Sequence, residues 1–417
     1  MAYLKYRTLP TIRLALTAGA AVLLGLTVAA QAQTYTILHN FAGRDGSGPE
    51  FALTRDAAGN LYGTTALGGS HCGSSGCGTV YELVRSGSNW ILKQLYDFTA
   101  GADGGLPESG VIFGPEGNLY GTTTSAGQYG AGTVYKLQPP ASVCKRTLCP
   151  WQETVLYSFT GLGDGGAPEG DLVVDRAANL YGTTAAGGTG SCQGGCGVVF
   201  ELTPSGGSWN FSVLYSFSAL SDGALPESGV TLDPSGNLYG TTVAGGAHTM
   251  GTVFELTKTG ATWTKTTLHD FQGGSDGGFP QGGVAVDPGG NLFGFTTAGG
   301  AHNNGTAFEL HPSSGGWNYS QLFDFGARIM SVVSTPVLDS AGNLYGCALF
   351  GGAHASGTIF KLTFLGGAWN YVSLHDFNGL DGQYPYGSVL LDGAGKLYGT
   401  VSEGGAFGGG VVFEIAP

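Results

Sequence analysis

Short runs of alternating apolar and polar residues, separated by glycine-rich turns, recur along the chain. The stretch 229–233 (Gly-Val-Thr-Leu-Asp) alternates and predicts a strand, and a turn containing Pro and Gly follows at 233–237. Residues 238–242, 252–256 and 263–271 predict three more strands, and nothing in the unit has helical periodicity. Four short antiparallel strands in one such unit are typical of a β-propeller blade.

The same unit occurs seven times, at intervals of 52 to 61 residues. An Asn-Leu-Tyr-Gly-Thr-Thr segment, intact in four copies and varied in the last three, marks the unit, with its aromatic residue at Tyr62, Tyr120, Tyr181, Tyr239, Phe293, Tyr345 and Tyr398. A Gly-Thr-Val-aromatic segment follows, with its aromatic residue at Tyr81, Tyr135, Phe200, Phe254, Phe308, Phe360 and Phe413. Each tryptophan lies eight residues before a phenylalanine: Trp90, Trp151, Trp209, Trp263, Trp317 and Trp369. Fixed-period repetition of this kind predicts a repeat architecture.

The ends of the repeat array predict a closed ring. The last copy stops after its third strand, at 411–415, and Tyr35 to Phe41 match the fourth strand of the unit. An N-terminal strand that completes the last blade would remove two exposed sheet edges, whereas an open solenoid would need capping units. We therefore expect residues 33–417 to form one all-β domain, a seven-bladed β-propeller of four-stranded antiparallel blades.

The first 32 residues lie outside the repeats. Lys5, Arg7 and Arg13 precede an uncharged, mostly apolar run, and Ala30-Gln31-Ala32 is a small-x-small cleavage signal. This pattern predicts a signal peptide at 1–32 and export of the mature protein. An uncleaved membrane anchor is the alternative; after cleavage, no later segment is apolar enough to span a membrane.

Charge and cysteine content narrow the partners and the compartment. The net charge is −13, and removal of three positive charges with the signal peptide gives −16, which disfavours nucleic acid as a partner. Export favours local disulfides in three close pairs: Cys72–Cys77, Cys144–Cys149 and Cys192–Cys196. A metal site built from two pairs is the alternative, although no pair has two-residue zinc spacing. We interpret Cys347, in a predicted strand, as a buried inert thiol.

Two kinds of loop should share one face of the propeller. One contains Asp-Gly followed by Pro-Glu: Asp45 with Glu50, Asp103 with Glu108, Asp164 with Glu169, and Asp222 with Glu227, with Gln281 and Tyr386 replacing Glu in two other copies. The Asp side chains are expected to close turns. The Glu side chains, with Glu108 and Glu227 as candidates, face either solvent or a ligand, since carboxylates around a channel suit acid/base catalysis or a cation.

The second kind of loop carries histidines. His248, His302 and His354 occupy one loop position in consecutive copies and are either solvated or ligands for a metal or a proton shuttle. The sixth copy has residues 328–333 in place of the Asp-Gly/Pro-Glu loop. A shortened loop there would open a notch beside Tyr384 and Tyr386 that suits a sugar or a peptide. The repeated tryptophans either stack on a polysaccharide or pack against the adjacent blade.

The string D-x-x-G-N-L-Y-G-T-T-x-x-G-G…G-T-V-F-E-L resembles the GloVer (Gloeobacter/Verrucomicrobia) repeat of exported bacterial proteins, over residues 33–417. The resemblance implies an exported bacterial protein, which is secreted, periplasmic or at the cell surface and is often tethered by a C-terminal anchor, and it implies no known activity. Here Pro417 follows the last repeat directly, so tethering and release both stay open. The first half of the unit, Val-x-x-Asp-x-x-Gly-Asn-Leu-Tyr, is also similar to NHL and SMP-30 propellers, which supports the strand order.

These observations favour a monomeric, non-enzymatic binding or scaffold propeller whose partner is a polysaccharide, a peptide or a cell-surface component. No cofactor is expected, since no P-loop, HExxH or Ser-His-Asp order is present. The alternative is a lyase or hydrolase that acts on polysaccharide through the loop face. Carboxylates that converge near the axis with a His or Tyr would favour the enzyme, and splayed loops with exposed aromatic rings would favour the binder.

Overall fold

The computed structural model describes residues 33–140, 151–219 and 221–417. Gln33–Pro417 forms one compact unit by its internal contacts. The predicted signal peptide and the predicted Cys144–Cys149 disulfide lie outside the described residues and stay predictions. No helix in the described ranges is long and apolar enough to cross a membrane.

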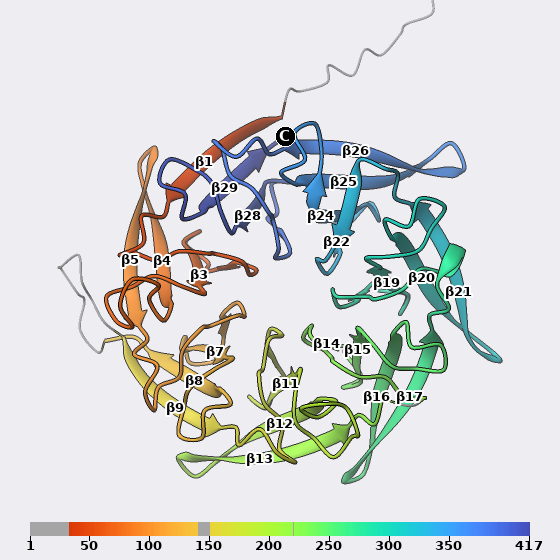
Figure 1. Cartoon of the computed structure of the whole chain (residues 1–417), viewed down its shortest axis with the longest axis horizontal. Helices are drawn as coiled ribbons and strands as arrows, with labels where there is room; N and C mark the ends of the chain where they lie inside the picture. Colours follow the sequence, from red (N-terminus) through yellow and green to blue (C-terminus); the bar gives the residue numbers. More distant parts are fainter. Residues whose placement is uncertain (1–32, 141–150, 220) are drawn as a thin grey trace, which may run out of the picture. The chain divides into compact units, whose positions relative to one another are not determined.

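The described residues form seven antiparallel sheets arranged in a ring (Figure 1). The first blade holds β2 (Thr54–Arg55), β3 (Leu61–Thr65), β4 (Thr79–Ser86) and β5 (Asn89–Asp97), and the second holds β6 (Ile112–Phe113), β7 (Leu119–Thr123), β8 (Thr133–Gln138) and β9 (Gln152–Ser158). The third holds β10 (Val173–Val174), β11 (Leu180–Thr184), β12 (Val198–Ser205) and β13 (Ser208–Ser216), and the fourth holds β14 (Thr231–Leu232), β15 (Leu238–Thr242), β16 (Thr252–Thr259) and β17 (Thr262–Asp270).

The last three blades follow the same order from the axis outward. The fifth blade holds β18 (Ala285–Val286), β19 (Leu292–Phe295), β20 (Thr306–Ser313) and β21 (Gly316–Asp324). The sixth holds β22 (Ile329–Val332), β23 (Val337–Leu338), β24 (Leu344–Gly351), β25 (Thr358–Leu365) and β26 (Ala368–Asp376). The seventh holds β27 (Leu390–Leu391), β28 (Leu397–Val401), β29 (Val411–Ala416) and β1 (Thr34–Asn40). A short 3₁₀ turn, η1 (Gly274–Asp276), precedes β18. The predicted seven-bladed propeller is confirmed.

Strand β1 is the outer strand of the sheet that contains the C-terminal strand β29. The two pair antiparallel from Thr34 opposite Ala416 to Asn40 opposite Val411. The hydroxyl of Tyr35 also donates to the carbonyl oxygen of Asp381 at 2.7 Å. In Figure 1 the red start and the blue end of the repeat array lie side by side in this sheet. The edge of β29 is therefore covered.

The innermost strands are shorter than the sequence predicts. The predicted strand 229–233 is reduced to Thr231–Leu232, and its six counterparts also span two residues. Gly229 approaches the adjacent blade so closely that a Cβ there would lie 2.2 Å from the carbonyl oxygen of Asp171. Residues near the axis therefore pack against the neighbouring blade instead of extending the ladder of their own sheet.

The sixth blade differs from the others where its loop sequence differs. Residues 328–333 are not a shortened loop: they contain β22, which pairs with the lengthened strand β24. The segment is rich in β-branched residues, with Ile329, Val332 and Val333 buried, and such residues favour strands. The segment is therefore a strand of this blade's own sheet and not an open loop.

The core consists of apolar clusters between adjacent blades. One cluster joins Tyr120 of the second blade to Leu180 and Phe200 of the third. Four of the repeated tryptophans contact the repeated tyrosine of the preceding blade at ring-centroid distances of 5.9 to 6.4 Å: Trp151 with Tyr62, Trp209 with Tyr120, Trp263 with Tyr181, and Trp317 with Tyr239. These tryptophans join blades, which supports the packing interpretation.

Candidate axial site

Seven equivalent residues point toward the axis, and we call them the axial ring: Glu50, Glu108, Glu169, Glu227, Gln281, Val333 and Tyr386. The residue two positions earlier has a left-handed φ in every blade, from 50° to 66°: Gly48, Leu106, Ala167, Leu225, Phe279, Ser331 and Tyr384. Only one of these is glycine, and a left-handed non-glycine residue costs about 1–3 kcal/mol.

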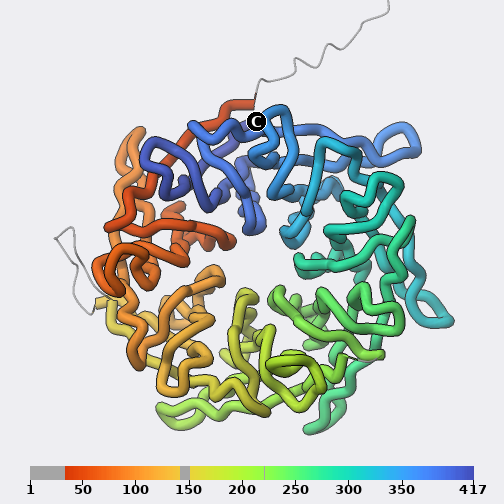
Figure 2. Tube along the Cα trace, in the orientation of Figure 1, coloured from red at the N-terminus to blue at the C-terminus, as the bar shows by residue number. Residues whose placement is uncertain are grey.

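The surrounding backbone holds each of these loops in its strained conformation. In the second blade, Leu106 N donates to the carbonyl oxygen of Cys77 in the first blade at 2.9 Å. The carbonyl oxygen of Leu106 accepts from Thr124 N at 3.0 Å. The loop is therefore fixed between two blades, and the inner loops converge on the central opening (Figure 2).

A repeated threonine fixes the chain next to the ring. The Thr64 hydroxyl donates to the carbonyl oxygen of Ser109 in the next blade at 2.6 Å. Equivalent bonds of 2.7 to 3.0 Å reach the next blade from Thr183, Thr241 and Thr400, and Thr122 donates to the carbonyl oxygen of Pro168 in the next blade at 3.0 Å. Cys347 takes the place of this threonine in the sixth blade, and its thiol donates to the carbonyl oxygen of Gly387 at 2.8 Å. Cys347 is buried, as expected, but it also joins two blades.

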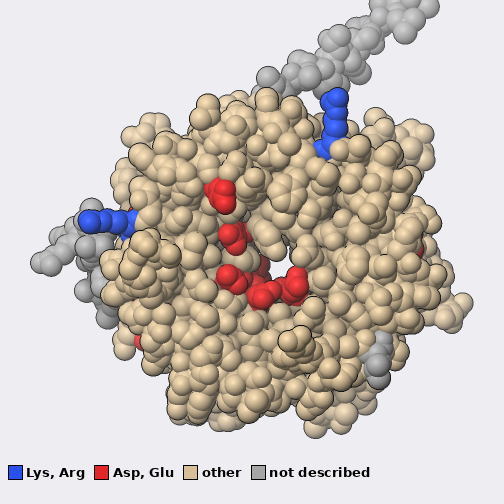
Figure 3. Space-filling view, viewed as in Figure 1, with Lys and Arg blue, Asp and Glu red and all other residues tan. Residues whose placement is uncertain are grey.

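The seven ring side chains and Phe51 line one cavity of about 230 Å³. Figure 3 shows acidic side chains gathered around the central opening on this face. Among the described residues that line the cavity, none is Lys, Arg or His. Four consecutive blades supply carboxylates, and the next three supply an amide, an isopropyl group and a phenol.

The ring carboxyl groups are poorly neutralised. Burial, and then the charges of Glu108 and Glu403, raise the pKa of Glu50 to about 7. Burial, and then Glu227 and Glu108, raise the pKa of Glu169 to about 7. The site therefore holds more negative charge than its surroundings stabilise.

The other ring groups respond to the same crowding. Burial raises the pKa of Glu108 and of Glu227, whose Oε2 accepts from Gln281 Nε2 at 3.3 Å. Burial and the four ring carboxylates raise the pKa of Tyr386 to about 12. Tyr386 also packs edge-on against Phe51 at a ring-centroid distance of 6.2 Å. All four carboxyl groups shift in the same direction.

A second cavity of about 80 Å³ adjoins the first and shares most of the ring residues. It is also lined by small residues that follow the ring in sequence, including Gly229, Gly282 and Ser388. Asp171 adds one carboxylate to those of the shared ring residues. Oδ1 of Asp171 accepts from Gly110 N of the preceding blade at 2.6 Å, and burial raises the pKa of Asp171.

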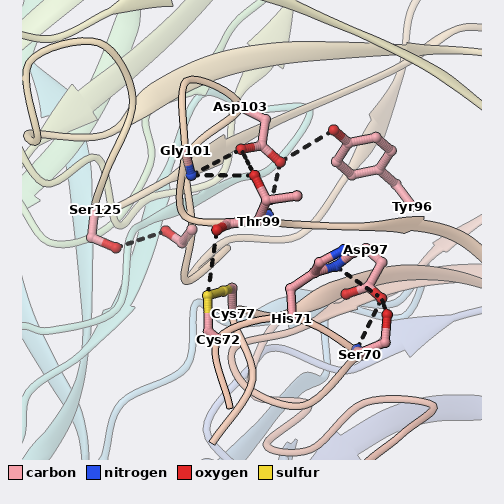
Figure 4. The surroundings of a disulfide bond; sticks show 11 residues. Ser70, His71, Cys72, Cys77, Tyr96, Asp97, Thr99, Gly101, Asp103 and Ser125 are labelled. Carbon is pink, nitrogen blue, oxygen red and sulfur yellow. Dashed lines mark hydrogen bonds and ion pairs between the residues drawn. A yellow bond between two sulfur atoms is a disulfide. The ribbon is translucent and has the colours of Figure 1, made fainter.

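The loop aspartates close turns, as their position before Gly predicts. Figure 4 shows Asp103, which accepts from Tyr96 Oη at 3.2 Å, Thr99 N at 2.8 Å and Gly101 N at 3.1 Å. Asp45 and Asp276 accept from their own loop backbones and from His39 and His269 in the same way. These carboxylates are occupied by their own blades.

The histidine candidates do not join the axial ring. His248, His302 and His354 are exposed on the loops of separate blades. Nδ1 of His302 lies 3.9 Å from Asp324 Oδ1. No group of three His, Cys, Asp or Glu side chains within the described ranges is placed to hold a metal ion. Of the aromatic candidates, Tyr386 lines the cavity, whereas Tyr384 packs on Phe350 at 5.4 Å between ring centroids.

Two of the predicted disulfides are present, Cys72–Cys77 and Cys192–Cys196, with Cα atoms 5.6 and 5.1 Å apart. Each closes a glycine-rich loop on the face of the axial cavity. In Figure 4 the Cys72–Cys77 loop lies beside Ser70, whose N donates to Asp97 Oδ2 at 2.9 Å. The bonds stabilise loops and are consistent with an exported protein.

Sequence comparison covers nearly the whole chain. The pattern described as the Gloeobacter/Verrucomicrobia repeat matches residues 15–191, 141–336 and 326–417. The chain belongs to the Gloeobacter/Verrucomicrobia repeat family. The resemblance drawn from the Asn-Leu-Tyr-Gly-Thr-Thr segments is therefore confirmed. No curated protein matches this Gloeobacter/Verrucomicrobia repeat chain in sequence.

Solved structures share the propeller fold of this Gloeobacter/Verrucomicrobia repeat protein. A candidate 6-phosphogluconolactonase from Bacteroides uniformis has a TM-score of 0.53 at 11% identity and covers 82% of this chain and 89% of its own. A periplasmic gluconolactonase from Pseudomonas aeruginosa has a TM-score of 0.49 at 15% identity, with coverages of 85% and 99%. A candidate oxidoreductase (glucose dehydrogenase) from Thermus thermophilus has a TM-score of 0.44 at 16% identity, with coverages of 92% and 99%. At 11% identity the likeness to the Bacteroides uniformis structure shows the fold alone.

Proposed function

We propose that the protein is an exported binding propeller that takes an amine-bearing ligand into the axial cavity. The observation that carries this proposal is the convergence of Glu50, Glu108, Glu169 and Glu227 on one cavity that no described basic side chain lines. Carboxylates around a cleft focus negative potential and concentrate cations there. An alkylammonium group would gain charge-assisted hydrogen bonds from the ring.

The size and the other walls of the cavity favour an organic cation. A volume of about 230 Å³ is far larger than a single ion. Tyr386 and Phe51 offer aromatic surface to the carbon chain of a ligand and a ring face to its charge. Of the broader candidates, glycan or peptide, a peptide with a free amine matches this combination best.

Proton release gives a direct test. Because the pKa values of Glu50 and Glu169 stand at about 7, a bound ammonium group should displace protons near neutral pH. We expect isothermal titration with pentylamine to show proton release between buffers of different ionisation enthalpy, and affinity that rises from pH 5 to pH 8. The matched neutral probe, 1-pentanol, should bind without proton release. Pentylamine affinity that is the same at pH 5 and pH 8 would contradict the proposal.

Charge-neutral variants locate the binding. Glu50→Gln with Glu169→Gln should weaken pentylamine binding by about 10- to 100-fold, the value of one or two hydrogen bonds to charged groups. Glu116→Gln is the matched control, since Glu116 is an exposed carboxylate in the turn between β6 and β7. If both variants bind pentylamine equally well, the amine does not bind in the ring.

An enzyme that acts on carbohydrate is the second candidate, and the convergence of carboxylates with Tyr386 favours it. Groups with a pKa of about 7 suit general acid/base work. A glycosidase pair, however, needs environments that push two pKa values apart, and the four ring groups shift together. The test is to incubate the protein with a panel of polysaccharides and to measure new reducing ends or unsaturated uronates. Release of these products by the parent protein but not by Glu169→Gln would mean that the protein is an enzyme and not a binding protein.

A further inference from the structure

The layer beneath the axial ring breaks the sevenfold symmetry at one residue. The positions two residues after the ring are Ala52, Gly110, Asp171, Gly229, Gly283, Thr335 and Ser388. Asp171 is the one charged residue among these seven described positions. A residue needed by the blade itself would recur, so Asp171 has a role that the repeat does not require.

The carboxylate of Asp171 is only half used by the protein. Oδ1 accepts the hydrogen bond from Gly110 N, at 2.6 Å. No donor among the described residues lies within hydrogen-bond distance of Oδ2, and Asp171 lines the lower cavity. That cavity shares Glu169 and Glu227 with the upper one, so the two cavities are adjacent and Asp171 lies next to the space that the ring encloses.

The lower cavity is narrow because backbone surrounds it. A Cβ at Gly170 would lie 2.3 Å from Gly229 N, and a Cβ at Gly282 would lie 2.3 Å from the carbonyl oxygen of Ser334. With about 80 Å³ available, it admits a slim terminal group such as a primary ammonium.

We propose that the ligand is a linear diamine, with one ammonium among the ring glutamates and the second on Asp171. This inference rests on the proposed function and adds a specificity-determining residue to it. The raised pKa of Asp171 supports the assignment, because a buried carboxyl group with one backbone donor gains most from a cation.

The test compares two probes that differ by one amine. Isothermal titration at pH 8 should show that 1,5-diaminopentane binds the intact protein at least tenfold more tightly than pentylamine. Asp171→Asn should bring the diamine to within about twofold of pentylamine, the statistical advantage of two equivalent ends.

Asp171→Gly guards against a folding artefact, because glycine occupies the same position in three other blades, at Gly110, Gly229 and Gly283. It should reproduce the loss of diamine preference while the protein keeps a single cooperative melting transition. Equal affinity for both probes in the intact protein would overturn the role of Asp171 and leave amine binding standing. Binding of neither probe would overturn the proposed function itself.

Discussion

Glu153 occupies a position where other blades place an aromatic ring between neighbours. The residue two positions after the repeated tryptophan site stacks on the preceding blade: Tyr35 on His375 at 3.8 Å, Phe211 on Tyr157 at 3.9 Å and Tyr319 on His269 at 4.3 Å between ring centroids. In the second blade this position carries a carboxyl group. Glu153→Gln keeps the shape of the side chain and removes the charge, so it measures the cost of that charge.

The surroundings of Glu153 disfavour its ionised form. Its Oε1 is buried without a partner, as is Nε2 of Gln94. Burial, and then the charge of Asp103, raise the pKa of Glu153 to about 7. The other titratable groups that it affects, Tyr96 and Tyr135, are neutral phenols with raised pKa values. No described cation offsets the charge.

The sign and size of the effect follow from proton linkage. The folded pKa is higher than the unfolded value of 4.5, so the stability present below pH 4.5 is lost as pH rises toward 7. A shift of the Glu153 pKa from 4.5 to about 7 lowers the free energy of unfolding by up to ~3 kcal/mol above pH 7. For a domain of this length the unfolding entropy is about 0.8 kcal/mol/K, so this loss of stability lowers the melting temperature by about 4 °C.

Differential scanning calorimetry at pH 5 and pH 8 is the assay. Glu153→Gln should melt about 4 °C above the parent at pH 8, and the difference should shrink to about 1 °C at pH 5. Glu116→Gln, which neutralises an exposed carboxylate of the same blade, should show no such pH-dependent difference. A Glu153→Gln protein that melts below its parent at pH 8, or shows the same difference at both pH values, refutes the reasoning.

Three further changes test the ring and its closure. Without ligand, Glu50→Gln with Glu169→Gln should raise the calorimetric melting temperature at pH 8, since both carboxyl groups have a pKa of about 7 in the folded state; a lower value contradicts the crowding of charge. Deleting residues 34–40 removes the partner of β29 and should broaden and lower the melting transition; an unchanged sharp transition would count against closure. Cys347→Thr should change the free energy of unfolding in urea by less than about 0.5 kcal/mol, because Thr64 makes the same bond in the first blade. Cys347→Val, which cannot make this bond, should lower the free energy of unfolding by about 1 kcal/mol. Equal losses would mean that the bond to the next blade is unimportant.

The number of blades could be predicted from the sequence because each copy carries the same alternation, turn residues and aromatic positions. The lengths of the innermost strands could not. The alternation at 229–233 is the same whether the side chains pair in a ladder or pack on a neighbouring blade, and only β14, Thr231–Leu232, pairs. Residues 328–333 were misread because the absence of the loop motif does not reveal the pairing of β22 with β24.

The axial site was only partly predictable for a similar reason. The repeated loop motif makes Glu108, Glu227 and Tyr386 candidates on one face, but nothing local indicates that their side chains converge on a single cavity. Their direction depends on a left-handed φ at residues such as Leu106 and Ala167, which are not glycine and precede proline. Hydrogen bonds from two different blades impose that conformation, so its cause is distant in sequence.

The left-handed residue occurs in all seven blades, including those with Val333 or Tyr386 in the ring. Its strain therefore belongs to the blade, which uses it to aim one side chain at the axis, and not to any ligand. Function then depends on which side chain each blade presents. Because glutamates come from four consecutive blades and Gln281, Val333 and Tyr386 from the other three, the cavity is acidic on one side and neutral on the other. A ligand with one charged end and an apolar chain would accordingly bind in one orientation, with its charge toward the first four blades and its chain toward the last three.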